Sequence, residues 1–156
     1  MKSPGLRNVA ASVRQKLLNI ASGKGEDFGL ILTRYALERL LYRLSQSEYS
    51  DQFVLKGAML FQVWAHAPHR PTRDLDLLGR GEPSPARCEN VFQEICATQV
   101  PDAGLIFTPE SVSAQRIKEE QQYEGVRVKS SELIPDRVRL GPEDLMRPLL
   151  PSIVFA

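Results

Sequence analysis

RPTRDLDLLG, at residues 70–79, is a turn-rich basic segment that runs into a short apolar strand containing two aspartates. Successive residues of a strand point to opposite faces, so Asp74 and Asp76 share one face. The leucines that alternate with them enter the opposite, buried face. Two neighbouring carboxylates repel each other unless a cation or a proton lies between them. Because hard divalent cations prefer oxygen ligands, the pair predicts a metal site, with Mg²⁺ as the ion.

A strand, a glycine turn and a helix are predicted just before these carboxylates. FVLK at 53–56 is a short apolar run, Gly57 follows it, and AMLFQVW at 58–64 has helical composition. A glycine at such a turn lets the backbone approach a phosphate closely, and the free N–H groups of the next helix attract the anion. Gly57 therefore predicts a phosphate-binding turn, although the same pattern also serves simple chain reversal.

Basic side chains flank both elements, namely Lys56, Arg70 and Arg73. Their charge suits a triphosphate or its leaving pyrophosphate, although each alone is equally compatible with a solvated surface charge. Mg²⁺ held by one or two carboxylates completes its shell with water and phosphate oxygens, so the arrangement favours a nucleoside triphosphate as ligand. The order of strand, glycine, helix, basic loop and acidic strand within residues 53–79 supports this hypothesis more than any one feature does.

The rest of the chain predicts helices around a sheet. Apolar spacing predicts helices at 9–20, 27–45 and 86–98, and strands at 105–108, 125–129 and, with a weaker pattern, 136–140. Residues 140–156 contain three prolines and show no clear period. This order favours an α+β or α/β sheet that carries helices over a helical bundle or a β-sandwich.

Composition limits the class of protein. A chain of 156 residues with 42% hydrophobic and 25% charged residues predicts one ordinary globular domain. The formal charge of +1 gives no overall attraction to nucleic acid, so phosphate binding must come from local arrangement. A DNA-binding module on the first two helices has little support, because its basic residues are sparse: Arg7, Arg14, Lys16 and Lys24.

The cysteines and the apolar runs indicate a compartment. Cys88 and Cys96 have no spaced Cys/His set around them that could hold zinc. The start of the chain lacks the apolar core of a signal peptide, and no apolar run approaches the roughly 18 residues of a membrane helix. The sequence therefore predicts a reduced, cytoplasmic protein with no membrane partner.

FVLKGAMLFQVW followed by RPTRDLDLLG resembles the first catalytic blocks of the AbiEii/AbiGii toxin family of nucleotidyltransferases, in the DNA polymerase beta-like superfamily. YEGVRVK at 123–129 and GPEDLMRPLL at 141–150 look like later parts of that domain, so the resemblance covers most of the chain from about Gly29 onward. It implies an α+β fold: a nucleotidyltransferase-like mixed β-sheet with flanking helices, here preceded by two N-terminal helices.

The resemblance also implies a domain organisation. Residues 1–156 would form a single nucleotidyltransferase-like domain, with an N-terminal helical part at about 5–46 and a catalytic-sheet part at about 53–140. The family continues into a C-terminal helical region, which is expected to be missing here. The chain is thus expected to be a shortened, truncated relative.

The implied activity is Mg²⁺-dependent transfer of a nucleoside monophosphate from a nucleoside triphosphate to an RNA, such as tRNA, or to a protein acceptor. The implied setting is a bacterial toxin–antitoxin or phage-abortive-infection system, with a cognate antitoxin as partner. By motif match, Asp74 and Asp76 would be the catalytic, metal-binding carboxylates, and Gly57 with Ala58 would occupy the phosphate turn. Because Gly or Ser is common at the position of Ala58, one contact to phosphate is expected to be lost.

A second departure concerns a third carboxylate, which such enzymes are expected to carry on a later strand between apolar residues. SSELIPDRVRL at 130–140 contains no convincing strand of that kind, and Asp136, the nearest substitute, suits a surface salt bridge better. Glu132, Glu143 and Asp144 are no better placed. Two interpretations remain: an active nucleotidyltransferase, or a catalytically inactive remnant that retains nucleotide or antitoxin binding.

Overall fold

The computed structural model describes residues 8–60, 73–118, 124–133 and 152–155. Its helices and strands are, in chain order, α1 (Val9–Lys24), α2 (Phe28–Gln46), β1 (Phe53–Lys56), β2 (Asp74–Gly79), α4 (Pro85–Ala97), β3 (Ile106–Lys118), β4 (Glu124–Leu133) and β5 (Ser152–Phe155). Residues 58–60 are also helical. Among the described helices, none has the length and apolar character needed to span a membrane.

The three predicted helices at 9–20, 27–45 and 86–98 are confirmed, and each begins at a polar N-cap. The side chains of Asn8, Asp27 and Ser84 accept hydrogen bonds from backbone N–H groups in the first turns of α1, α2 and α4. Gly25 ends α1 in the left-handed region at φ 64°, where its N–H bonds the last carbonyls of the helix. Local sequence signals therefore fix the helix boundaries.

The five strands form one mixed sheet in the order β1-β2-β5-β4-β3, so the predicted α+β class and mixed sheet are confirmed. β2 pairs with β5 in parallel, whereas the pairs β1–β2, β4–β5 and β3–β4 are antiparallel. The strand predicted at 105–108 is too short, because β3 continues to Lys118 past an irregularity between Thr108 and Ser113. β5 lies in the stretch for which the sequence predicted no element.

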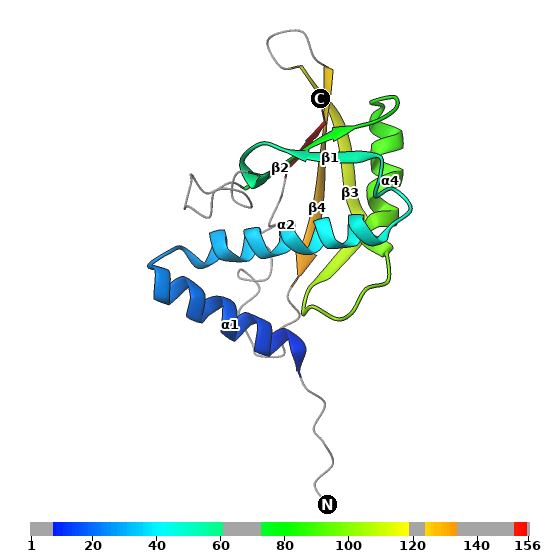
Figure 1. Cartoon of the computed structure of the whole chain (residues 1–156). Helices are drawn as coiled ribbons and strands as arrows, with labels where there is room; N and C mark the ends of the chain where they lie inside the picture. Colours follow the sequence, from blue (N-terminus) through cyan, green and yellow to red (C-terminus); the bar gives the residue numbers. More distant parts are fainter. Residues whose placement is uncertain (1–7, 61–72, 119–123, 134–151, 156) are drawn as a thin grey trace, which may run out of the picture.

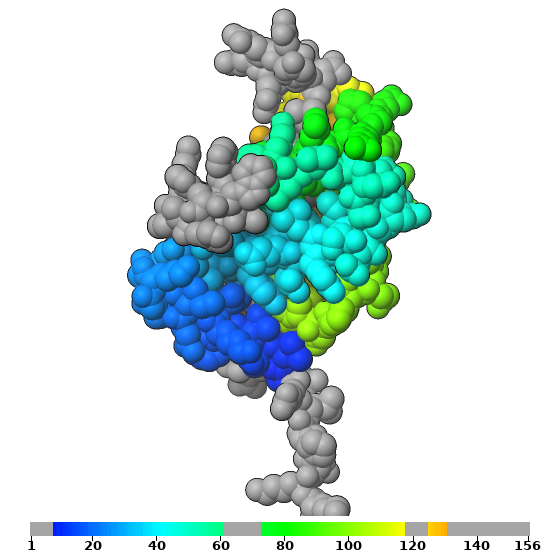
Figure 2. All heavy atoms as spheres, in the orientation of Figure 1, coloured from blue at the N-terminus to red at the C-terminus, as the bar shows by residue number. Residues whose placement is uncertain are grey.

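Helices α2 and α4 cover one face of the sheet, and α1 lies against α2 (Figure 1). In the space-filling view α1 and α2 form much of the near surface (Figure 2). The main core joins side chains of both covering helices to the strands, with the fully buried members Leu37, Leu40, Leu75, Leu77, Phe92, Ile95, Val126 and Val128. A smaller cluster of Leu17, Ala21 and Ile31 joins α1 to α2. Ile20 of α1, part of the predicted apolar spacing, is instead 44% exposed.

Replacing Leu75 and Leu78 of β2 separately tests which face of this strand meets the core. Leu75 is fully buried and Leu78 is 47% exposed, so Leu75→Ala should lower the free energy of unfolding by about 2–5 kcal/mol. Leu78→Ala should change it by less than about 0.5 kcal/mol. Urea denaturation of both variants measures the difference, and equal losses would show that β2 does not alternate between a core face and a second face.

Candidate functional site

The two aspartates of the motif lie on β2 and face away from the main core. Leu75 and Leu77 are buried, whereas Asp74 is exposed and Asp76 is half-buried. This alternation is the one that the sequence predicts, and it brings both carboxylates to one side of the sheet. Both aspartates also take part in interactions within the protein, so neither is an isolated charge.

The antiparallel register between β1 and β2 places a basic residue on the same side of the sheet as the aspartates. Lys56 is the partner of Asp76, and Val54 is the partner of Leu78. Directly opposed residues of an antiparallel pair point to the same face. We call this side of the sheet the carboxylate face; on β1 and β2 it carries these four residues and Asp74. Leu78 and Val54 are about half exposed, at 47% and 50%, which shows that this part of the carboxylate face is open.

Gly57 lies directly against the carboxylate of Asp76. Its φ of +75° is in the left-handed region, which side-chain-bearing residues rarely adopt. A Cβ atom added there would overlap Oδ2 of Asp76 and come within 3.0 Å of its Cγ. The next residue, Ala58, begins the helical segment, and the Leu60 N–H donates to the Gly57 carbonyl at 3.1 Å. The turn and a carboxylate therefore occupy one small volume because residue 57 has no side chain.

The other predicted site residues have different positions. Arg73 is exposed and immediately precedes β2. Arg70 lies outside the described residues, as do Asp136, Glu143 and Asp144. The structure thus brings together Lys56, Gly57 and Asp76, with Asp74 two residues along the strand.

Two further cations lie on the carboxylate face, and the sequence analysis gave them no role. In register, Asp76 pairs with Val154 of β5, and Val154 pairs with Arg127 of β4. Lys129, two residues from Arg127, points to the same side because residues i and i+2 of a strand share a face. The alternation in GVRVK signals that these cations share a face, but it does not show which residues they oppose.

The oxygen ligands that the site offers suit a cation that keeps part of its hydration shell. Within the described ranges, no cluster of three or more His, Cys, Asp or Glu side chains could hold a metal. Two carboxylates on one face fit Mg²⁺, which usually takes one or two carboxylates and completes its shell with water and phosphate oxygens. Asp74 and Asp76 are the described residues that would hold it.

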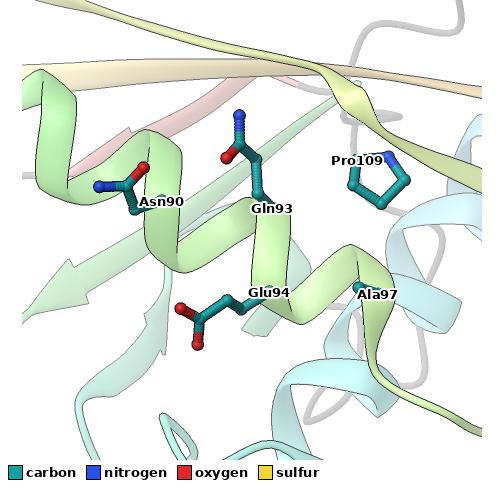
Figure 3. A pocket seen from close by; sticks show the side chains of 5 residues that line it. All are labelled: Asn90, Gln93, Glu94, Ala97 and Pro109. Atoms are coloured by element: carbon teal, nitrogen blue, oxygen red, sulfur yellow. The ribbon is translucent and has the colours of Figure 1, made fainter.

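A shallow pocket of about 370 Å³ lies elsewhere, between α4 and β3. It is lined by Asn90, Gln93, Glu94, Ala97 and Pro109, and Gln93 and Glu94 project on different sides of α4 (Figure 3). Glu94 accepts a hydrogen bond from the Tyr49 hydroxyl, which raises the pKa of Tyr49 to about 12. None of the predicted site residues lines this pocket, so it is separate from the site on the carboxylate face.

The surroundings of the two buried cysteines favour a structural role over a reactive one. Cys88 and Cys96 form no disulfide, and both lie on the buried face of α4, in the main core. Burial raises the pKa of the Cys88 thiol, which disfavours the reactive thiolate.

Comparison with known proteins identifies the family. The profile of the family described as "Nucleotidyl transferase AbiEii toxin, Type IV TA system" matches residues 39–142, which is more than half of the chain. The chain belongs to this family. The AbiEii match spans β1, the Gly57 turn and β2, and it ends beyond β4. No curated protein matches the chain.

One solved structure similar to this AbiEii-family chain is MenT4, a nucleotidyltransferase toxin from Mycobacterium tuberculosis H37Rv. The sequences are 23% identical, and the TM-score is 0.47. The match covers 92% of this chain and 43% of MenT4, so the chain spans less than half the length of that protein.

Glycine-to-alanine variants separate backbone strain from contact with the site. Gly57→Ala and Gly25→Ala both force a Cβ onto a left-handed residue, which costs about 1–2 kcal/mol of unfolding free energy. A Cβ at Gly25 meets nothing within 4 Å, whereas one at Gly57 meets Asp76. Both variants should therefore be destabilised, but only Gly57→Ala should lose Mg²⁺-dependent nucleotide binding, as measured by isothermal titration calorimetry.

Gly23→Ala is the matched control, because Gly23 lies within α1, has open space around its Cβ position and gains helix propensity as alanine. It should be as stable as the unaltered chain or more so. Unchanged nucleotide binding by Gly57→Ala would remove the Gly57 turn from the site.

Proposed function

We propose that this chain binds a nucleoside triphosphate with Mg²⁺ on the carboxylate face and transfers its nucleoside monophosphate to an RNA acceptor. The observation that carries the proposal is the contact between Gly57 and Asp76. A phosphate-binding turn and a metal-binding carboxylate that act on the same phosphate group must lie close together, and the closeness of Gly57 and Asp76 supports these roles. Membership of the AbiEii family implies a nucleotide substrate and a cognate antitoxin, which fits this arrangement.

The roles of the residues follow from their positions. Asp74 and Asp76 would hold the ion, whose charge would offset the negative charge of the phosphoryl group in transfer. The backbone at Gly57 and Ala58 approaches the triphosphate, where the first free N–H groups of the following helix attract an anion. Lys56, in register with Asp76, and Arg73, next to Asp74, supply positive charge for the pyrophosphate that leaves. We assign Arg70 to the same task from the sequence alone.

An inactive, nucleotide-binding remnant is the second candidate, and one observation favours it. β5 pairs with β2 in parallel, and its residues in register with Asp74 and Asp76 are Ser152 and Val154. The strand SIVF therefore places no carboxylate beside the pair. If the chain lacks a general base, transfer should be slower by about 10²- to 10⁴-fold, while binding of the ion and the triphosphate persists.

Charge-neutralising variants of the aspartates test the proposal. Purified protein is incubated with labelled nucleoside triphosphates, Mg²⁺ and bulk tRNA, beside Asp74→Asn and Asp76→Asn. Label transfer should be lost in both variants, and on removal of Mg²⁺ with EDTA, because the site then lacks its ion. Asp51→Asn, at an exposed turn before β1, is the control and should behave like the unaltered chain.

Binding measurements then separate the two candidates. If no label is transferred but Mg²⁺-dependent nucleotide binding is present and depends on Asp74 and Asp76, the remnant is the correct interpretation. If Mg²⁺ changes neither the melting temperature nor the nucleotide affinity of the unaltered chain, both candidates are wrong.

A further inference from the structure

Arg127 has two properties that point to a bound ligand. It lies on the carboxylate face, in the cross-strand row that runs from Asp76 through Val154. The side chain is half-buried, and its Nε atom is buried without a hydrogen-bond partner among the described residues. A guanidinium offers five donors and stays charged, so a buried N–H without an acceptor is costly unless a ligand supplies one. A phosphate, like a carboxylate, can accept two parallel hydrogen bonds from a guanidinium.

The distance from Arg127 to the two aspartates allows the reacting molecules to contact Arg127 and the carboxylates at the same time. Neighbouring strands are about 4.8 Å apart, so the backbones of Asp76 and Arg127, two strands apart, are separated by about 10 Å. β5 runs parallel to β2 and antiparallel to β4, so moving from Asp76 to Asp74 corresponds to moving from Arg127 toward Lys129. The two cations of β4 thus oppose the two carboxylates of β2 across β5.

The strand order distinguishes two sides of the carboxylate pair. β1, with Lys56 and the Gly57 turn, lies on one side of β2, and β5 and β4 lie on the other. In an in-line displacement the attacking oxygen and the leaving oxygen lie on opposite sides of the phosphorus. If the pyrophosphate leaves toward Gly57, the acceptor must approach from the side of β4.

We propose that Arg127 binds a phosphate group of the RNA acceptor, with Lys129 beside it, and positions the acceptor hydroxyl for attack. In the transfer, this hydroxyl oxygen forms a bond to the α-phosphorus, and the bond from phosphorus to the bridging oxygen breaks. The pyrophosphate leaves with the electron pair, and the hydroxyl proton passes to water. This inference rests on the proposed function for the direction of transfer. Arg127 is a positioning residue in it, because it touches the acceptor away from the reacting atoms.

Arg127→Gln, in the full chain, tests the assignment by two separate affinities. Its affinity for bulk tRNA should fall roughly 5- to 10-fold, and the slope of log K against log salt between about 50 and 200 mM should be less steep by about 0.7–0.9, the value for one lost phosphate contact. Its Mg²⁺-dependent affinity for nucleoside triphosphates should not change. If label is transferred, KM for tRNA should rise while KM for the triphosphate stays constant.

Arg34→Gln is the matched control, because Arg34 is a half-buried arginine on α2 that pairs with Glu26 at 3.5 Å. It should leave both the tRNA affinity and its salt slope unchanged. Arg127→Lys keeps the charge and the aliphatic stem, so it should fold even if the glutamine variant does not, and it should show a smaller loss of tRNA affinity with the salt slope retained.

Several outcomes would overturn the inference. These are absence of tRNA binding by the unaltered chain, a tRNA salt slope for Arg127→Gln equal to that of Arg34→Gln, or a loss of triphosphate affinity in place of tRNA affinity. The last result would place Arg127 on the side of the triphosphate. Failure of the proposed function is distinct: tRNA affinity would still depend on Arg127, while nucleotide binding would not depend on Asp74 or Asp76.

Discussion

The contact between the Asp76 carboxylate and the backbone of Gly57 is the constraint on which the rest of the site depends. A side chain at residue 57 would occupy the space of that carboxylate, and its φ of +75° already favours glycine. The same contact fixes where β1 ends and where the next helix begins, because Lys56 remains in register with Asp76 while Ala58 is already helical. One residue without a Cβ thus couples the position of a helix N-terminus to the position of an acidic side chain.

The sheet keeps this contact in place because one of its faces packs in the main core, whereas the other carries the aspartates. Each buried leucine of β2 contributes about 1.5–3 kcal/mol by leaving water, so the core under α2 and α4 determines which way the strand faces. Because the aspartates alternate with these leucines along β2, they must point to the opposite face. A slip of one residue would bury both carboxylates and expose the leucines, which would cost far more than any contact on the carboxylate face supplies. The positions of Asp74 and Asp76 are therefore consequences of hydrophobic packing.

Local sequence patterns predicted the parts of the fold that local forces determine. α2 follows from its apolar face and its Asp27 cap, and β2 from its alternation. β5 could not be predicted, because four apolar residues in a proline-rich stretch become a strand only by pairing with β2 and β4, which are distant in sequence. The place of Arg127 in the cross-strand row of Asp76 could not be predicted for the same reason. The alternation of GVRVK shows that Arg127 and Lys129 share a face of their strand. Only β5, which lies between β2 and β4, shows that this is also the face of Asp76.

In the proposed function, nucleotide binding and turnover depend on different parts of this architecture. The turn, the carboxylates and Lys56 belong to the adjacent strands β1 and β2, whose antiparallel register the core side chains fix. Proton transfer from an acceptor hydroxyl needs a further base, and β5 offers Ser152 and Val154 at the positions in register with the carboxylates. Loss of such a base raises the barrier by only about 3–5 kcal/mol and leaves the Gly57 turn and the two carboxylates in place. Under the proposed function, a chain with this strand would retain its nucleotide even if it turned over slowly. Affinity, and its dependence on single residues, therefore tests the proposed site more directly than rate does.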